Sequence, residues 1–408
     1  RVDTCRTGLG RSPRVPRVLH VVPTDRITWL LLRRRLTRLA AGGCEIHVAC
    51  GRAPDSGAAD GGEYEAGLTA LGFHLHYLPF EREISPITDA RCAIALFAEV
   101  RRGGYDIIHT HNPKAGLLGP PVAQLAGAPH VLHTVHGFLF HDHIAGLHRM
   151  AALAAERWTA GWSDHLLFQS EEDLEFARSH RFKSDEHLHL VGNGVDENYF
   201  DLDADPEAGA RTRACFGWGA DDFVVGTVGR VVREKGFLEY FDMAGRLARS
   251  VPSARFLIVG LFEPEQSDAV DPFALARAHG IEDRCQITQG RDDLPALYSA
   301  MDVFVMPSHR EGLSKSLLEA TAMARPTVAC DIRGCREVVI DGDTGLLVPV
   351  RDAVALTESV SVLQRDEVRR RRMGVAGRQR LLGLYTESGV AQRVLDVYGA
   401  LASLPTRR

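Results

Sequence analysis

A short apolar strand, a polar loop and a helical pattern follow one another directly in Val303-Phe-Val-Met-Pro-Ser-His-Arg-Glu311-Gly-Leu-Ser-Lys-Ser-Leu-Leu-Glu319-Ala. A strand, a loop and a helix in this order are typical of the repeating unit of a parallel sheet. Glu311 is predicted in the loop and Glu319 about two turns inside the helix, some 12 Å further along at about 1.5 Å per residue. This spacing suits a ligand with hydroxyl groups at both ends and a phosphate group between them.

The same alternation of short β-branched runs and longer helical patterns extends in both directions along the chain. Strands are predicted at 17–22, 46–50, 74–78, 107–111, 130–135 and 165–168, and then at 223–228, 254–259, 285–288, 303–306, 327–329 and 345–348. The composition shifts at 201–220, which is poor in strand formers. We therefore predict an α/β fold of two Rossmann-like, doubly wound domains, 14–200 and 201–385, that face each other across a cleft. A C-terminal helix at 386–408 is expected to pack back on the first domain.

Composition excludes several classes of protein. With 45% hydrophobic and 25% charged residues the chain is an ordinary globular protein, and its net charge of −5 argues against a nucleic-acid partner. The eight cysteines form no Cys-x-x-Cys pair, which is typical of reduced thiols in a reducing compartment. No apolar run approaches the roughly 20 residues that cross a bilayer, and no signal segment is recognisable. We therefore expect a cytoplasmic protein.

Two loops carry candidate ligand-binding groups. Backbone N–H groups of Gly312, Leu313 and Ser314 are predicted at a helix N-terminus, where an anion is stabilised, and the Glu319 carboxylate can accept both hydroxyls of a ribose. The alternative for Glu319 is a solvated residue on an amphipathic helix.

The second loop is Gly226-Thr-Val-Gly229-Arg230-Val-Val-Arg233-Glu-Lys235-Gly236. Its glycines allow close approach to a phosphate, and Arg230 and Lys235 supply a guanidinium fork and a point charge for a diphosphate. The alternative is an ordinary turn with exposed basic residues.

Histidines gather after two strands of the first half, in His109-Thr-His111 and in His133-Thr-Val-His136-Gly137. Pairs of this form occur in the metal sites of hydrolases, so a metal-dependent hydrolase is an alternative. The nearby carboxylates Asp106 and Asp142 lack ligand spacing, and we predict no metal.

Together these motifs resemble the family-4 retaining glycosyltransferases of the GT-B fold, over nearly the whole chain. The resemblance rests on Gly229-Arg230, Lys235-Gly236, Glu311-Gly312, Glu319-Ala320, Asn193–Asp196, Gly334, Glu337–Val339, Asp341-Gly342 and Thr344–Pro349. It implies that Arg230 and Lys235 bind the donor diphosphate, that Glu311 and His136 contact the donor sugar, and that Glu319 holds the ribose. The sequence departs from the family pattern at Arg325, usually a small residue, and at Cys335, often glycine.

The resemblance also implies an activity. We expect a retaining, metal-independent hexosyltransferase with no cofactor, which moves a sugar from a nucleotide-sugar to a hydroxyl of a lipid-diphosphate-linked or polysaccharide acceptor. The implied donor is a UDP-hexose or UDP-N-acetylhexosamine, and the implied products are capsule, O-antigen or N-glycan precursors. A UDP-sugar epimerase of the same architecture is the other alternative.

A basic amphipathic segment near the start suggests attachment to the inner membrane surface. Trp29, Leu32, Leu36 and Leu39 share one helical face beside Arg33, Arg34, Arg35 and Arg38. Such a helix is typical of interfacial membrane contact, so we expect a peripheral membrane protein. The alternative is that the apolar face belongs to the first helix of the domain and packs on its sheet.

Overall fold

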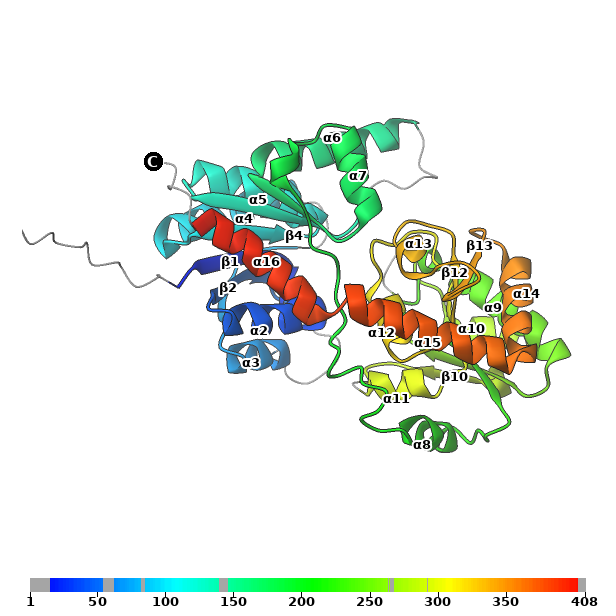
Figure 1. Cartoon of the computed structure of the whole chain (residues 1–408). Helices are drawn as coiled ribbons and strands as arrows, with labels where there is room; N and C mark the ends of the chain where they lie inside the picture. The colour runs from blue at the N-terminus through cyan, green and yellow to red at the C-terminus, as the bar shows by residue number, and fades with distance from the viewer. Residues whose placement is uncertain are drawn as a thin grey trace, which may run out of the picture. The chain divides into compact units, whose positions relative to one another are not determined.

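The computed structural model describes residues 15–53, 62–81, 85–138, 146–262, 264, 268–291 and 293–402, which form two parallel sheets with helices around them (Figure 1). The chain divides into two compact units. The first unit contains described residues of Arg1–Thr134, Ala154–Leu166 and Val394–Arg408, and the second those of Val135–Leu153 and Leu167–Arg393. The predicted α/β class is confirmed, and the domain boundaries predicted at residues 200 and 385 stay predictions.

The first sheet has the strand order β3-β2-β1-β4-β5-β6-β7. Its strands are β1 (Arg17–Thr24), β2 (Glu45–Gly51), β3 (His74–Tyr77), β4 (Ile107–His111), β5 (His130–Val135), β6 (His165–Phe168) and β7 (Leu188–Leu190). Strand β1 pairs in parallel with both β2 and β4, so the winding direction reverses beside it. The sequence analysis missed β7, which has too few residues to give a periodic pattern.

Helices follow the strands of this sheet. They are α1 (Asp25–Ile27), η1 (Thr28–Leu32), α2 (Arg33–Ala41), α3 (Glu63–Ala70), α4 (Pro86–Gly103), α5 (Pro113–Leu125), α6 (Gly146–Trp162), α7 (Glu171–Ser179) and η2 (Asp185–His187). The first helical segment begins four residues before the predicted Trp29, because the Thr24 side chain accepts a hydrogen bond from the Ile27 N–H and caps it. A π-helical turn, η1, then leads into α2.

The second sheet has the order β10-β9-β8-β11-β12-β13. Its strands are β8 (Phe223–Val228), β9 (Ala254–Val259), β10 (Cys285–Thr288), β11 (Val303–Met306), β12 (Thr327–Cys330) and β13 (Gly345–Val348). The order reverses between β8 and β11, which pair in parallel. In open α/β sheets this reversal point, at the carboxyl ends of the strands, is where ligands bind.

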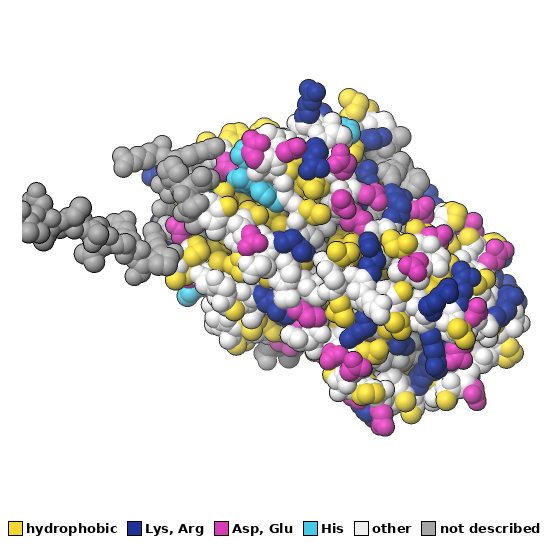
Figure 2. Space-filling view, viewed as in Figure 1, with side chains coloured by type: hydrophobic (Ala, Val, Ile, Leu, Met, Phe, Trp, Pro, Cys, Tyr) yellow, Lys and Arg dark blue, Asp and Glu magenta, His cyan; other side chains and the backbone are white. Residues whose placement is uncertain are grey.

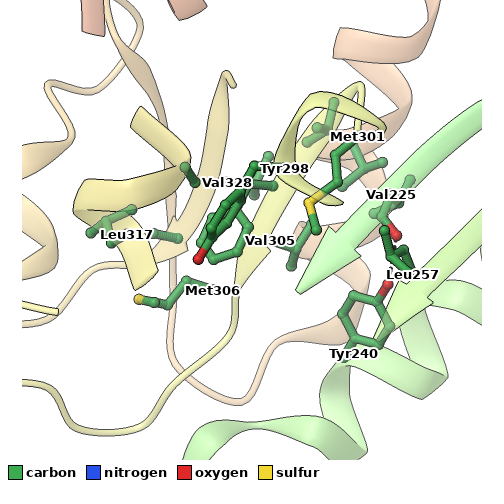
Figure 3. Packing of buried hydrophobic residues seen from close by; sticks show 14 of the residues in the cluster. Val225, Tyr240, Leu257, Tyr298, Met301, Val305, Met306, Leu317 and Val328 are labelled. Atoms are coloured by element: carbon green, nitrogen blue, oxygen red, sulfur yellow. Dashed lines mark hydrogen bonds between the residues drawn. The ribbon is translucent and has the colours of Figure 1, made fainter. Parts of the chain in front are cut away.

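Around this sheet lie the remaining helices. They are α8 (Ala208–Cys215), η3 (Arg233–Lys235), α9 (Phe237–Ser250), α10 (Pro272–Ala278), η4 (Glu282–Arg284), α11 (Leu294–Ser299), α12 (Lys315–Ala322), α13 (Cys335–Val338), α14 (Ala353–Arg365), α15 (Glu367–Leu384) and α16 (Glu387–Ala402). Two fully buried tyrosines, Tyr240 and Tyr298, fill the core beside the strands (Figure 3). The Tyr240 hydroxyl donates to the carbonyl of Val225 at 2.7 Å, so its polar end is satisfied inside the apolar core.

The C-terminal turns of α16 belong to the first unit. The hydroxyl of Tyr398 lies 2.6 Å from Nδ1 of His109 on β4, and the side chain of Leu395 occupies the space where a Cβ at Gly42 would lie. These contacts fix the end of the chain beside β4 and the end of α2. No helix in the described part of the chain is long and apolar enough to cross a membrane.

Candidate active site

The loops after β8 and β11 meet at the reversal point of the second sheet. Nζ of Lys235 lies 2.7 Å from Oε1 of Glu311, and the Ser308 hydroxyl donates to the same oxygen at 2.8 Å. Both charged side chains are mostly buried, with 21% of Lys235 and 11% of Glu311 exposed. Two residues 76 positions apart, which the sequence predicted as parts of one site, are therefore brought into direct contact.

An ion pair and a histidine–carboxylate contact also hold the loop after β11 against the segment that follows β8. Nε of Arg310 donates to Oε1 of Glu234 at 2.7 Å, and Nε2 of His309 lies 2.9 Å from Oε1 of Glu239. Burial raises the pKa of the Glu234 carboxyl, but Arg310, Lys235 and Arg230 together outweigh it and the net pKa is lowered. Half-buried Arg230 and Lys235 therefore both lower the pKa of the Glu234 carboxyl. The cationic side chains predicted to bind a diphosphate converge on one loop pair.

The backbone of the Glu311 loop passes so close to other backbone that glycine is required. A Cβ at Gly312 would overlap the carbonyl oxygen of His136, and a Cβ at Gly236, which has a φ of +72°, would overlap that of Pro307. The first of these contacts places His136, at the end of β5, beside the Glu311 loop within the second unit. The predicted residues His136, Glu311 and Lys235 thus belong to one neighbourhood.

Glu319 lies on α12, the helix that follows the Glu311 loop. Its Oε2 accepts a hydrogen bond of 3.0 Å from the hydroxyl of Tyr298, a fully buried residue of α11. Burial and then the Glu319 charge raise the pKa of that hydroxyl well above its usual value, so it stays a donor. Tyr298 fixes the orientation of one Glu319 oxygen. The sequence analysis missed this contact, because an apolar pattern does not distinguish a core tyrosine from a positioning one.

The helix boundary differs from the prediction. Ser314 is the N-cap and α12 begins at Lys315, so Glu319 lies just over one turn inside the helix, not two. Gly312 and Leu313 precede the helix, and the buried side-chain amide of Asn193 donates to the Leu313 carbonyl at 2.8 Å. That hydrogen bond stabilises the loop at Leu313, directly before α12. It gives Asn193, which the sequence supplied only as a family motif, a defined structural role.

Glu337 has a structural role that the sequence did not reveal. Its carboxylate accepts hydrogen bonds from the backbone N–H groups of Glu171 and Glu172, both at 3.1 Å, and from the Ser170 hydroxyl. These donors form the N-terminus of α7, so Glu337 neutralises the positive end of that helix dipole. The contact ties α7 to α13.

The two residues that depart from the family pattern, Cys335 and Arg325, contact other residues of the second unit. Cys335 is fully buried, and its Sγ is 3.9 Å from Sδ of Met306, the last residue of β11. Burial and then the nearby Glu311 raise its thiol pKa well above the ordinary value, so the sulfur stays protonated and inert. Arg325 donates to the backbone carbonyls of Met323 and Met301, both at 2.7 Å, and serves to hold chain turns.

Two groups of side chains in the first unit have the spacing of metal ligands, and one of them is fully buried. His20, His109 and His111 each offer a ligand atom, and these atoms lie within 4.8 Å of one another, as do those of Glu45, His47 and His74. The two ring nitrogens of His109 already contact Tyr398 and, at 2.7 Å, the Thr134 hydroxyl. A metal on His109 would have to displace one of these partners. Asp142, which the sequence offered as a nearby carboxylate, lies outside the described residues.

Burial keeps two histidines of this sheet, His20 and His133, neutral. The pKa of His20 is lowered to about 3 by burial and by Arg35, and that of His133 to about 4 by burial. Neutral rings can pair with one another and with hydroxyls, and Nδ1 of His20 lies 3.0 Å from Nε2 of His111. The group serves as a polar core between β1 and β4.

Comparisons with known proteins place the chain in a family. Residues 211–380 match the family described as glycosyl transferases group 1, and residues 31–194 match the glycosyl transferase 4-like domain. The protein therefore belongs to the family-4 type of glycosyltransferases with the GT-B fold, as the motifs predicted. This membership favours neither the epimerase nor the hydrolase alternative.

Its relatives are enzymes of sugar transfer. The UDP-Gal:alpha-D-GlcNAc-diphosphoundecaprenol alpha-1,3-galactosyltransferase of Escherichia coli is 28% identical over 70% of this chain and 73% of its own. The alpha-maltose-1-phosphate synthase of Mycobacterium tuberculosis is 30% identical over 72% of this chain and 78% of its own. The Anabaena protein HepE, solved in complex with UDP-glucose, is 18% identical with a TM-score of 0.76 over 94% of this chain and 99% of its own.

Proposed function

We propose that this glycosyltransferase moves a hexosyl group, with retention of anomeric configuration, from a UDP-sugar to a hydroxyl of a lipid-diphosphate-linked or polysaccharide acceptor. One observation carries the proposal: Lys235 and Glu311 meet at the reversal point of the second sheet, beside the His136 backbone. The UDP-galactose donor and diphosphoundecaprenol acceptor in the name of the Escherichia coli relative support the choice of substrates.

Different residues of the site bind the diphosphate, the sugar and the ribose of the donor. Lys235 and Arg230 neutralise the diphosphate, and because their charge is already in place it stabilises the leaving group most when that group carries most charge. Glu311 and His136 contact the sugar. Glu319, oriented by the Tyr298 hydroxyl, accepts the ribose hydroxyls. The short loop of Gly312, Leu313 and Ser314 lets backbone N–H groups approach the phosphate oxygens.

The Lys235–Glu311 pair has a further use in this scheme. Without donor, each of these mostly buried charges compensates the other, which avoids the cost of an isolated charge in the site. With donor, a flexible lysine side chain rotates its ammonium to the diphosphate, and the carboxylate becomes available to a sugar hydroxyl. The pair is thus a preformed binding site for a ligand with an anionic part and a hydroxylated part.

Retention follows in the proposed reaction from attack on the face that the diphosphate leaves. The bond between the anomeric carbon and the phosphate oxygen breaks, the acceptor oxygen bonds to that carbon, and the acceptor proton moves to the departing phosphate oxygen. No enzymic nucleophile takes part. Arg230 and Lys235 supply the positive charge for the leaving group, so the proposed reaction needs neither a metal ion nor a cofactor.

We also propose that the enzyme works in the cytoplasm at the inner membrane surface, where a lipid-diphosphate acceptor would be found. Two of the arginines at 33–38 contact other parts of the protein instead of presenting their charge outward. Arg35 is 4% exposed, and the Arg33 guanidinium lies 4.2 Å from the ring centre of Trp29. Leu32, Leu36 and Leu39 are buried, as the packing alternative predicted.

A ligand screen tests the donor assignment. UDP, GDP and ADP, each alone and as a hexose conjugate, are added to the full chain and the shift in its melting temperature is measured. UDP and its sugars at 100 times their dissociation constant should stabilise the protein by about 2.7 kcal/mol. Stabilisation by GDP or ADP alone would overturn the choice of base, and no stabilisation by any of them would overturn the donor site.

A further inference from the structure

Helix α4 (Pro86–Gly103) has one face in the core of the first unit and one face in solvent. Cys92, Leu96 and Val100, spaced four residues apart, are buried in the core cluster that also contains residues of β1, β4 and α5. The opposite side carries large apolar side chains at unusual exposure, with Ile87 77% and Ile94 71% exposed. Because these two are seven residues apart, they lie on one stripe of the helix.

The charged residues of α4 are sorted by sign between the two faces. Its acids turn inward, since Asp89 pairs with Lys114 of α5 at 2.7 Å and Glu99 accepts a hydrogen bond of 2.6 Å from the Tyr105 hydroxyl. Its bases turn outward, and Arg91, Arg101 and Arg102 are all exposed. Within the described residues these three arginines form no ion pair. We define the outer face of α4 as Ile87, Arg91, Ile94, Phe97, Arg101 and Arg102.

Another arginine-rich helix shows that this sorting is not general. On α15 (Glu367–Leu384) Arg371 pairs with Glu367 at 2.6 Å and Arg378 with Asp201 at 3.4 Å. Basic and acidic side chains are mixed over α15 in Figure 2, where they are dark blue and magenta. Such a mixed surface is that of an ordinary solvated helix, whereas the outer face of α4 is purely apolar and cationic.

We propose that the outer face of α4 docks on an anionic membrane surface. Apolar side chains flanked by arginines on one face are what an interfacial helix requires, because the apolar groups enter the acyl boundary while the cations meet the headgroups. The proposal rests on the proposed lipid-linked acceptor and deepens it by naming the surface that brings the enzyme to that acceptor.

Other occupants of the outer face fit less well. A second copy of this chain related by a twofold axis would bring Arg91, Arg101 and Arg102 against the same arginines, with no carboxylate on the face to compensate them. A nucleic acid would match the arginines but leave Ile87 and Ile94 without an apolar partner. The basic segment at α2 presents fewer outward cations, because Arg35 is buried and Arg33 stacks on Trp29.

Vesicle co-sedimentation of the full chain tests the proposal, with vesicles of phosphatidylcholine alone or mixed with phosphatidylglycerol. The wild type should bind only the anionic vesicles and leave them at high salt. The variant Arg91→Gln/Arg101→Gln/Arg102→Gln should bind roughly 100-fold more weakly, since each basic residue near such a surface is worth about fivefold. Ile87→Ser/Ile94→Ser should lose at least about tenfold.

Matched controls come from exposed positions elsewhere. Arg365→Gln/Arg371→Gln/Arg372→Gln removes the same charge, and Val368→Ser/Val375→Ser removes exposed apolar groups from α15. Both should bind like wild type. Equal losses in the control and α4 variants, or anionic binding that survives in the α4 variants, would overturn the docking face. So would wild type that ignores anionic vesicles, or α4 variants that alter only the oligomeric state.

UDP binding of every variant is measured alongside. It should be unchanged, because α4 belongs to the first unit and the donor residues to the second. Loss of vesicle binding with UDP binding intact supports the docking face. Wild type that binds vesicles but no nucleotide would refute the proposed transferase donor site and leave the docking face standing.

Discussion

Replacing Lys235 by methionine distinguishes the contribution of its ammonium group to stability from its contribution to turnover. The substitution keeps the length of the side chain but leaves the Glu311 carboxylate, 11% exposed, with the Ser308 hydroxyl as its remaining described side-chain partner at 2.8 Å. Breaking a fully buried ion pair costs about 3–5 kcal/mol. Because Lys235 is 21% exposed and Ser308 remains, we expect a smaller loss of unfolding free energy, about 1–3 kcal/mol.

The double variant Lys235→Met/Glu311→Gln should regain most of that stability, since it removes the uncompensated carboxylate while the glutamine amide oxygen can still accept from Ser308. Turnover should behave differently. Loss of one preorganised group that meets developing charge costs about 10²–10³ in kcat, and neither variant restores a cation. Urea unfolding and initial-rate kinetics on the same preparations measure both quantities. Arg233→Met is the matched control, because Arg233 is an exposed cation of the same turn.

The reasoning would be refuted by two results. If Lys235→Met keeps wild-type kcat and only raises the KM for donor, Lys235 acts on ground-state binding. If the double variant is no more stable than the single one, the Lys235–Glu311 contact does not carry the stability assigned to it.

Other predictions concern Glu319, its partner Tyr298 and the buried His133. Glu319→Ala should weaken UDP binding at least tenfold by calorimetry, since hydrogen bonds to a charged group contribute about 1.5–3 kcal/mol, and unchanged binding would sink the ribose assignment. Tyr298→Phe should raise the KM for donor several-fold with little change in kcat, because it frees the Glu319 carboxylate to rotate; an effect on kcat alone would count against a positioning role. His133 has its pKa lowered to about 4, below the unfolded value of about 6.5, so the unfolded state binds the proton first. The contribution of His133 to the unfolding free energy should therefore fall by up to roughly 3 kcal/mol as pH drops from 6.5 to 4. The variant His133→Asn should make the pH dependence less steep, with the contribution of His20 remaining, and a slope unchanged in the variant would contradict it.

Much of the fold was predictable because strand periodicity and turn residues are local. The ranges 107–111, 130–135, 223–228 and 254–259 match strands of the structure residue for residue. That Lys235 and Glu311 lie near each other was predictable from the rule that carboxyl ends of parallel strands share one edge, whereas their direct ion pair was not predicted. The contact of Tyr298 with Glu319 and the capping of α7 by Glu337 were not predictable, since they depend on how elements far apart in sequence pack.

Which arginines are exposed was also not predictable from the sequence. A helical pattern at 29–39 identified which residues share a face, but it could not say that Arg35 is buried. The outward arginines of α4 went unnoticed because Asp89 and Glu99 make the sequence of that helix look mixed in charge. Only their inward ion pair and hydrogen bond show that the exposed face is cationic.

Retaining sugar transfer is tested by a proton NMR spectrum of the product made from a UDP-hexose with an α-linked sugar and a lipid-diphosphate-linked acceptor. The anomeric coupling constant reports the configuration of the new bond. The account predicts a new α-linkage that forms in the presence of a chelator. A β-linked product, an epimerised donor without acceptor, or transfer that stops when divalent metal is removed would contradict it.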